Sequence, residues 1–282
     1  MQKETGKLFI VSTPIGNLED ITFRAVKILQ DVDLILAEDT RKSLKILRHY
    51  QIETLIIPFH EHNEEKKYKE IISKLKKGIN IALISDAGTP LISDPGYKLV
   101  KYAKQDKLSV VPIPGPSSLI AALSASGMRS DKFTFLGFLS VKSSQRRKTL
   151  SQLKHRDESI IIFESPKRVL DTVKDIKAII GDDLIICVAR ELTKIYEDIF
   201  SGSPAEIIRI LEKETNKQKG EFVLIINNYQ SNIDFFSYEI DRLISILTSE
   251  LKPSLAAKIA SKITNFDKDI CYKKIIEYDR NL

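Results

Sequence analysis

The sequence predicts an α/β protein with two α/β domains and a small C-terminal helical appendix. Short apolar runs alternate with longer amphipathic ones through most of the 282 residues, which is typical of βαβ units. Three prolines and a glycine gather in VPIPGPSS at 111–118, and after about residue 230 the pattern becomes wholly helical. We therefore place the domains at 1–115 and 116–230 and the appendix at 231–282.

The first domain is expected to hold a mostly parallel sheet, because a helix separates each strand from the next. Its strand candidates are short apolar runs, namely KLFIVS at 7–12, DLILAED at 33–39, ETLIIPF at 53–59, NIALIS at 80–85 and LSVVPIPG at 108–115. The spacing of apolar residues between these runs predicts helices over 20–32, 41–50, 64–78 and 96–105.

In the second domain the strand candidates lie closer together, so a more antiparallel sheet is expected. They are KFTFLGFL at 132–139, ESIIIFES at 158–165, DLIICVARE at 183–191, YEDIFSG at 196–202 and GEFVLIINN at 220–228. From Ser237 onward the pattern predicts a helix, a turn at LKP, a second helix over 253–263 and a short third helix. Pro253 stands at the start of the second helix, where proline is favoured.

Composition narrows the class of protein. Lys and Arg number 44 against 38 Asp and Glu, and this mild excess permits an anionic partner without requiring one. Cys187 and Cys271 lie far apart, so neither a disulfide framework nor a structural zinc site is expected. No run approaches the roughly 20 apolar residues that span a bilayer, and the polar N-terminus has no signal-peptide core. We therefore expect a cytoplasmic protein and no membrane partner.

Three unusual loops follow strands of the first domain. They are STPIGNLED at 12–20, SDAGTPLISDPG at 85–96 and PIPGPSS at 112–118. The second contains Ile-Ser-Asp-x-Gly twice. Ligands of open α/β sheets bind at the carboxyl ends of the strands, so a sheet could bring these loops together around one ligand.

The loops lack the motifs that bind phosphates. The first holds a single glycine, Gly16, where a dinucleotide site needs G-x-G-x-x-G, and no G-x-x-x-x-G-K-[ST] is present. They offer carboxylates, hydroxyls and glycines that allow close approach of a ligand to the backbone. This chemistry suits a neutral or cationic ligand with hydroxyl and amino groups.

Nine sequence blocks identify a family resemblance. They are STPIGNLEDIT, AEDTR, HEHNE, ISDAGTPLISDPG, PGPSS, GFL, FESPKR, ARELTK and KGEF, which run in that order from Leu8 to about Asn228. With these blocks the chain resembles the bacterial 16S ribosomal RNA cytidine 2′-O-methyltransferases of the tetrapyrrole methylase superfamily. The resemblance implies two domains of the tetrapyrrole methylase type, with S-adenosylmethionine in the cleft between them, and a homodimer. It also implies methyl transfer to a cytidine ribose in the decoding centre of 16S rRNA, within the 30S subunit.

The resemblance also implies a set of cofactor-binding residues. In the first-domain loops and the junction they are Pro14, Asp86, Gly88, Thr89, Leu91, Ile92, Ser117 and Ser118. From the second domain they are Phe163, Leu192, Gly220 and Glu221.

Acidic residues near these loops are candidates for the chemistry, because a base that takes the hydroxyl proton typically adds about 10²–10⁴-fold to the rate. We rank Glu38, Asp39 and Glu164 as nearest the reaction, without choosing among them. Asp39 could instead cap the following helix. Glu191 could merely pair with a neighbouring basic side chain.

Basic residues of two predicted loop clusters, together with Arg41 of AEDTR, are candidates for RNA contacts, because cationic side chains dominate binding to the phosphate backbone. The candidates are Arg41, Arg146, Arg147, Lys167 and Arg168. No aromatic motif of the RRM kind is present, so recognition by base stacking of that kind is not predicted. Most lysines of the helical appendix are interpreted as ordinary solvated side chains.

His60 and His62 resemble the beginning of a metal site, but no third ligand follows at a suitable spacing. We expect no metal, and we interpret this segment as a loop that lines the RNA entrance. Two other functions stay open: a methylase of a small tetrapyrrole, and a non-catalytic RNA-binding protein of ribosome assembly. The basic loops and helical tail argue against the first, and the intact glycine loops argue against the second.

Overall fold

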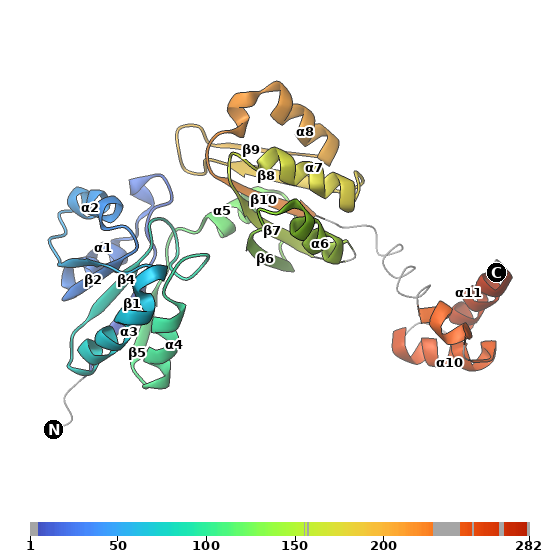
Figure 1. Ribbon diagram of the computed structural model, residues 1–282, viewed down its shortest axis with the longest axis horizontal. Coiled ribbons are helices and arrows are strands. Elements are labelled where there is room, and N and C mark those ends of the chain that lie inside the picture. The colour runs from blue at the N-terminus through green and yellow to red at the C-terminus, as the bar shows by residue number, and fades with distance from the viewer. Residues whose placement is uncertain are drawn as a thin grey trace.

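The computed structural model describes residues 5–154, 156, 158–227, 243–249, 251–264 and 268–280. The first half forms a parallel five-stranded sheet in the order β3-β2-β4-β1-β5 (Figure 1). Its strands are β1 (Lys7–Val11), β2 (Leu34–Ala37), β3 (Ile56–Pro58), β4 (Ile81–Ile84) and β5 (Ser109–Ile113). The predicted parallel sheet is therefore confirmed.

Helices cover both faces of this sheet. They are η1 (Leu18–Asp20), α1 (Phe23–Asp31), α2 (Thr40–His49), α3 (Glu61–Lys76) and α4 (Tyr97–Gln105). Successive strand residues point to opposite faces, so Leu34 and Leu36 pack with the α3 and α4 side, whereas Ile35 and Ala37 pack with α1 and α2. Burial on both faces explains why these strands are continuous apolar runs.

The second half forms a mixed five-stranded sheet in the order β6-β7-β10-β8-β9. Its strands are β6 (Phe133–Phe138), β7 (Ser159–Glu164), β8 (Ile185–Arg190), β9 (Asp198–Gly202) and β10 (Phe222–Asn227). Only β6 and β7 pair in parallel, and the other neighbours are antiparallel. This confirms the expectation of a more antiparallel second half.

The two faces of the second sheet differ in what covers them. One packs against α6 (Ser143–Leu153), α7 (Val169–Ile179) and α8 (Pro204–Lys213), which η2 (Thr215–Gln218) follows. The other face packs against α5 (Ser118–Ala125) and also against Ile15, which comes from the first half. The second face is therefore the one that meets the loops of the first sheet.

The C-terminal helices enclose a small core of their own. A helix over 243–249, α10 (Pro253–Thr264) and α11 (Lys268–Arg280) bury Ile244, Ala257 and Ile275 together. Cys187 and Cys271 are both buried and free, in different cores. The third helix spans 13 residues, so the prediction of a short one is wrong. The start of the predicted appendix, at 231–242, lies outside the described residues, and the proposed domain limits remain predictions.

Candidate functional site

The order of strands in the first sheet decides where its loops meet. Strand β1 lies between β4 and β5, and β2 lies on the other side of β4. All four are parallel, so the loops that follow them leave the same edge of the sheet. The three loops singled out in the sequence, together with the segment after β2, are thereby gathered at one place.

Hydrogen bonds join the three loops to one another. Thr13 and Gly88 exchange N–H···O bonds of 2.9 Å in both directions. The hydroxyls of Ser12 and Thr89 lie 3.0 Å apart, and Thr89 Oγ1 donates to the carbonyl of Pro116 at 3.1 Å. The Thr89 hydroxyl therefore connects the loops that follow β1, β4 and β5.

The doubled Ile-Ser-Asp-x-Gly loop has an unusual backbone. Gly88, Leu91, Ser93 and Gly96 all have positive φ, of 78°, 74°, 65° and 123°. Such φ values are uncommon for residues other than glycine and mark functional or tightly constrained segments. A Cβ on Gly96 would lie 2.6 Å from Leu83 Cδ2, so a side chain there would displace the buried Leu83 and would be strained at this φ. The two glycines are required by these two reversals of the chain.

The segment around His60 secures the end of this loop. His60 is the N-cap of α3 and forms a capping box with Asn63. Four residues after His60, Glu64 is buried, and its Oε1 accepts the backbone N–H groups of Lys98 and Leu99 at 2.9 and 3.2 Å. A carboxylate at this position also complements the dipole of α4. The HEHNE segment thus fixes the start of α4, directly after Gly96.

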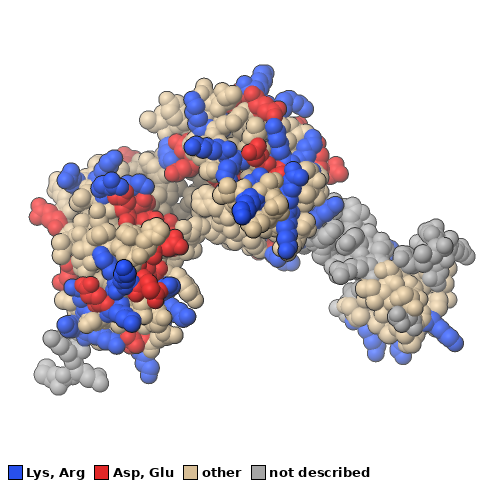
Figure 2. Space-filling model, viewed as in Figure 1, with Lys and Arg blue, Asp and Glu red and all other residues tan. Residues whose placement is uncertain are grey.

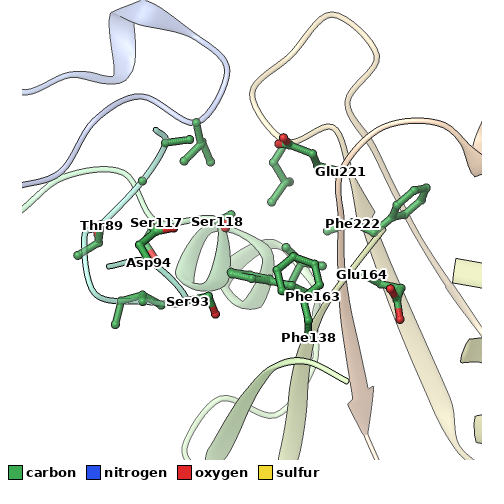
Figure 3. A pocket seen from close by; sticks show the side chains of 17 residues that line it. Thr89, Ser93, Asp94, Ser117, Ser118, Phe138, Phe163, Glu164, Glu221 and Phe222 are labelled. Atoms are coloured by element: carbon green, nitrogen blue, oxygen red, sulfur yellow. The ribbon is translucent and has the colours of Figure 1, made fainter. Parts of the chain in front are cut away.

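A cavity lies between the first-half loops and the second sheet (Figure 3), with a volume of about 910 Å³ including its open mouth. Its lining combines apolar and aromatic groups with hydroxyls and carboxylates. The lining residues are Ile15, Ala87, Gly88, Thr89, Ile92, Ser93, Asp94, Ser117, Ser118, Phe138, Phe163, Glu164, Ala189, Leu192, Glu221, Phe222 and Val223.

These residues fit S-adenosylmethionine. Apolar groups of the second sheet, such as Leu192 and Val223, can hold an adenine ring, and the seryl and threonyl hydroxyls can bind ribose or carboxylate oxygens. The exposed Glu221 carboxylate, which also lines the cavity, can accept hydrogen bonds from hydroxyl or amino groups of such a ligand. Gly88 has no side chain to keep such a ligand away from the backbone.

Aromatic side chains form the floor of the cavity on the second-half side. Phe163 makes edge-to-face contacts with Phe135 and Phe138, with ring centroids 4.8 and 5.7 Å apart. Phe138 is 57% exposed, and it lines the cavity next to Phe163 (Figure 3). The site therefore has a large aromatic surface that is open to a planar ligand.

Close contacts cross the cleft on either side of the cavity, and both involve a glycine. A Cβ on Gly16 would overlap the Lys194 side chain and lie 2.9 Å from Thr193 Oγ1. A Cβ on Gly137, at the end of β6, would lie 3.1 Å from Ser93 Oγ. At both points the two halves approach each other closely because one of them has no side chain there.

Comparisons with known proteins agree with this geometry. The sequence model of the family described as Tetrapyrrole (Corrin/Porphyrin) Methylases matches residues 7–208. A protein of Escherichia coli O157:H7 named ribosomal RNA small subunit methyltransferase I is 43% identical over 272 residues, which cover 96% of this chain and 95% of that protein. The chain belongs to the ribosomal RNA small subunit methyltransferase I family.

A Thermotoga maritima protein of the same name is 47% identical over 222 residues, which cover 79% of this chain and 98% of that protein. Among solved structures, uroporphyrin-III-C-methyltransferase from Thermus thermophilus has a TM-score of 0.56 at 14% identity, covering 79% of this chain and 94% of that one. At that identity the likeness shows the fold alone. The family resemblance and the tetrapyrrole methylase fold predicted from the sequence are both confirmed.

Eight of the twelve residues that the resemblance assigned to the cofactor line the cavity. They are Gly88, Thr89, Ile92, Ser117, Ser118, Phe163, Leu192 and Glu221. The other four, which are Pro14, Asp86, Leu91 and Gly220, do not. Leu91 packs on the core of the first half, and Gly220 lies against Glu191, whose Cδ would be 2.6 Å from an added Cβ. Leu91 and Gly220 therefore contribute to the conformations of their loops and do not line the cavity.

Sequence reasoning missed Asp94 and Phe138, although both stand in quoted blocks. Asp94 occupies the same place in the second half of the doubled loop as Asp86 does in the first, and that repetition was an available signal. Phe138 is the aromatic residue of the GFL block. No pattern in the sequence alone indicates that β6 ends at the cavity.

The acids after β2 form a network with the doubled loop. Asp39 accepts from the backbone N–H and side chain of Arg41, whose hydrogen bond is the main cause that lowers the pKa of Asp39 to about 2. The Asp39 N–H donates to Asp86 Oδ1 at 2.9 Å, and Lys42 Nζ lies 2.6 Å from Asp86 Oδ2. Burial, followed by the charge of Asp86, raises the pKa of Glu38. Glu38 and Asp39 adjoin the cavity loops but are absent from its lining.

Glu164 is committed to a different part of the fold. It follows Phe163 on β7, so the two side chains point to opposite faces, and Figure 3 shows Phe163 directed into the cavity and Glu164 away from it. The buried Glu164 carboxylate accepts from Thr172 Oγ1 at 2.6 Å, Arg168 Nη2 at 3.1 Å and the N–H of Ser165 at 2.7 Å. This environment counts against the predicted role of Glu164 near the reacting atoms.

The structure also separates the four basic residues that were predicted to lie in second-half loops. Arg146 and Arg147 lie in α6, so the prediction of a loop is wrong for these two. Arg146 is 4% exposed, and it shares the buried Asp175 carboxylate with Arg147. Burial tends to raise the pKa of Asp175, but hydrogen bonds from Arg147 and Arg146 outweigh it and the pKa is lowered. The predicted phosphate contact of Arg146 is inconsistent with this burial, because its guanidinium already binds inside the protein.

Arg168 is likewise turned inward, where its Nη2 also donates to the Leu139 carbonyl at 2.7 Å. Its side chain is 19% exposed. Lys167 is exposed, Arg147 is about half exposed, and the side chain of Arg41 is 87% exposed. Only these three of the predicted RNA-binding residues present their charge to solvent.

Neither histidine of HEHNE joins a set of metal ligands. Across the described residues, no group of three His, Cys, Asp or Glu side chains is placed to hold a metal ion. The rings of His60 and His62 contact each other edge to face, with centroids 5.9 Å apart. Among all the residues that the structure describes, no helix is long and apolar enough to cross a membrane.

Proposed function

We propose that this chain transfers a methyl group from S-adenosylmethionine to the ribose 2′-hydroxyl of a cytidine in 16S rRNA, within the 30S subunit and in the cytoplasm. One observation carries the proposal: in a chain of this family, the cavity between the two sheets combines carboxylates, hydroxyls and an aromatic surface. A homodimer is part of the proposal, on the strength of the family resemblance.

When bound, S-adenosylmethionine supplies an electrophilic methyl group on a sulfonium that is already a good leaving group. The protein's contribution is then largely positional, and holding two reactants in line is worth about 7–11 kcal/mol. The Thr89 hydrogen bonds fix the loops of the first half. The Gly16 and Gly137 contacts set how closely the second half approaches them.

RNA is proposed to bind through exposed cations at the rims of both halves. Figure 2 shows Lys and Arg side chains over much of the visible face of the second half. Arg147, Lys167 and Arg41 present charge to solvent, whereas Arg146 and Arg168 bind the buried carboxylates of Asp175 and Glu164. Contacts of this kind bind phosphates and do not read bases.

The proposal is tested with methyl-labelled cofactor and three acceptors: 30S subunits, protein-free 16S rRNA and uroporphyrinogen III. Label should enter the RNA of 30S subunits. The phosphodiester bond that follows the labelled ribose should resist alkaline hydrolysis, because a methylated 2′-oxygen cannot attack the adjacent phosphate. Label on the tetrapyrrole and none on RNA would overturn the proposal in favour of the small-molecule methylase.

The tetrapyrrole reading has one observation in its favour, namely the shared fold with uroporphyrin-III-C-methyltransferase. It is the weaker reading, because the relatives that match over nearly the whole chain carry a ribosomal RNA name. A non-catalytic binding protein is distinguished by combining calorimetry with the label assay. It would bind 30S subunits in calorimetry but transfer no label to them, even with S-adenosylmethionine in excess.

A further inference from the structure

Three acidic residues border the cavity, and two of them are neutralised. The Glu164 carboxylate is directed away from the cavity and is bound by Arg168 and Thr172. Glu221 is 78% exposed and lies 2.9 Å from Lys194 Nζ. Asp94 is the third, and within the described residues it forms no ion pair.

The position of Asp94 is set by the backbone of the doubled loop. It follows Ser93, whose φ of 65° turns the chain, and it precedes Pro95, which restricts the conformation of the residue before it. Asp94 lies on the loop side of the cavity, across from Phe163 (Figure 3). The backbone at Asp94 is therefore constrained by the residues on both sides of it.

The surroundings of Asp94 favour a carboxyl group that can accept a proton. Burial is the largest cause that raises its pKa to about 6, and the negative charges of Glu38 and Asp86 add to it. A hydrogen bond from Ser85 acts in the opposite direction. The side chain of Lys42 forms its ion pair with Asp86. A base is most effective when its pKa lies near the working pH, and Asp94 meets this condition better than Asp39.

We propose that Asp94 is the general base that takes the proton from the hydroxyl group that accepts the methyl. This inference rests on the proposed function. The acceptor oxygen forms its bond to the methyl carbon while the bond from that carbon to sulfur breaks. Sulfur keeps the electron pair and becomes a neutral thioether, and the hydroxyl proton moves to the Asp94 carboxylate. Glu38 and Asp86 act through Asp94 as positioning residues that raise its basicity.

The pH dependence has a definite sign. The base is the carboxylate form, so the rate of methyl transfer should rise with pH through about 6 and level off above it. Stability should move the other way. A carboxyl whose pKa is raised on folding destabilises the protein once pH exceeds the unfolded pKa of about 4, and this destabilisation is complete above about pH 6.

The test compares Asp94→Asn with Asp106→Asn, a control in an exposed ion pair with Lys76 at the end of α4. Single-turnover methyl transfer to 30S subunits is measured from pH 5 to 8, with S-adenosylmethionine saturating. Asp94→Asn should slow transfer by about 10²–10⁴-fold and remove the rise near pH 6. Calorimetry should give a dissociation constant for S-adenosylmethionine within about twofold of wild type, and Asp106→Asn should behave as wild type.

A second readout does not depend on activity. Asp94→Asn should unfold at a higher temperature than wild type at pH 8, and this difference should vanish at pH 4. Transfer by Asp94→Asn within tenfold of wild type overturns the inference, as does a loss explained entirely by weaker cofactor binding. If the variant does not fold, a wild-type rate that is flat between pH 5 and 8 overturns it instead. Failure of wild type to methylate 30S subunits would refute the proposed function itself and is seen in the same assay.

Discussion

Replacing Arg168 by alanine distinguishes a buried structural cation from a surface ligand for RNA. The sequence placed Arg168 in a loop, beside Lys167, and predicted that both bind phosphates. In the structure Arg168 donates to the buried Glu164 carboxylate and to the Leu139 carbonyl. Arg168→Ala should therefore destabilise the protein first, and Lys167→Ala should leave stability nearly unchanged.

The expected loss of stability in Arg168→Ala depends on the hydrogen bonds that Glu164 retains. Removing one partner of a buried ion pair destabilises proteins by about 3–5 kcal/mol. Glu164 retains its hydrogen bonds from Thr172 Oγ1 and the Ser165 N–H, so the loss is closer to one hydrogen bond to a charged group, about 1.5–3 kcal/mol. We expect about 2–3 kcal/mol. Adding Glu164→Gln should recover part of this loss, because the buried charge is then gone.

Urea unfolding followed by far-UV circular dichroism measures the difference, since the chain has no tryptophan for fluorescence. With a slope of about 2–3 kcal/mol per molar urea, the midpoint should fall by about 1 M for Arg168→Ala. An unchanged midpoint, with RNA affinity lowered as much as in Lys167→Ala, would refute the structural reading. Arg168 would then be a phosphate ligand, as the sequence indicated.

Three further predictions concern the cleft and its rim. Gly88→Val should abolish S-adenosylmethionine binding in calorimetry. The control Gly127→Ala, also at positive φ but with open space around it, should lose only about 1–2 kcal/mol of stability and bind the cofactor normally. Normal binding by a folded Gly88→Val protein would contradict the proposed cofactor site. Gly16→Ala should weaken cofactor binding by displacing Lys194, and adding Lys194→Ala should restore part of the affinity. Unchanged cofactor affinity in both variants would show that this contact does not influence cofactor binding. Lys167→Ala should reduce the slope of log affinity against log salt by about 0.7 on 30S subunits, and an identical slope would assign the lysine to ordinary surface.

The sequence was most informative about the first half of the molecule. Strands buried on both faces appear as unbroken apolar runs, and helices separate them, so the parallel sheet could be predicted. Once the sheet was parallel, the loops after β1, β4 and β5 had to leave the same edge. The strand order that places β1 between β4 and β5 could not be predicted, because it depends on contacts between distant segments.

Side-chain direction was harder to predict than loop position. Phe163 and Glu164 are neighbours in one block, and both were assigned to the site, yet a strand sends them to opposite faces. Strand periodicity could have shown that only one of them can face the cavity. It could not have shown which one, because that depends on α7 placing Thr172 against Glu164 and on the first-half loops approaching the other face.

Charged residues show the same limit from another direction. Arg146 and Arg147 are adjacent in the sequence, but one is buried against Asp175 and the other is half exposed. A run of basic residues therefore predicts a phosphate-binding surface only for those members that no buried acid has already bound. Asp175 lies on α7, about 30 residues further along the chain than the two arginines. The reverse argument applies to Asp94. Among the described residues it forms no ion pair, and it lies at the edge of a cavity. Its carboxylate therefore stays available for a ligand or a proton.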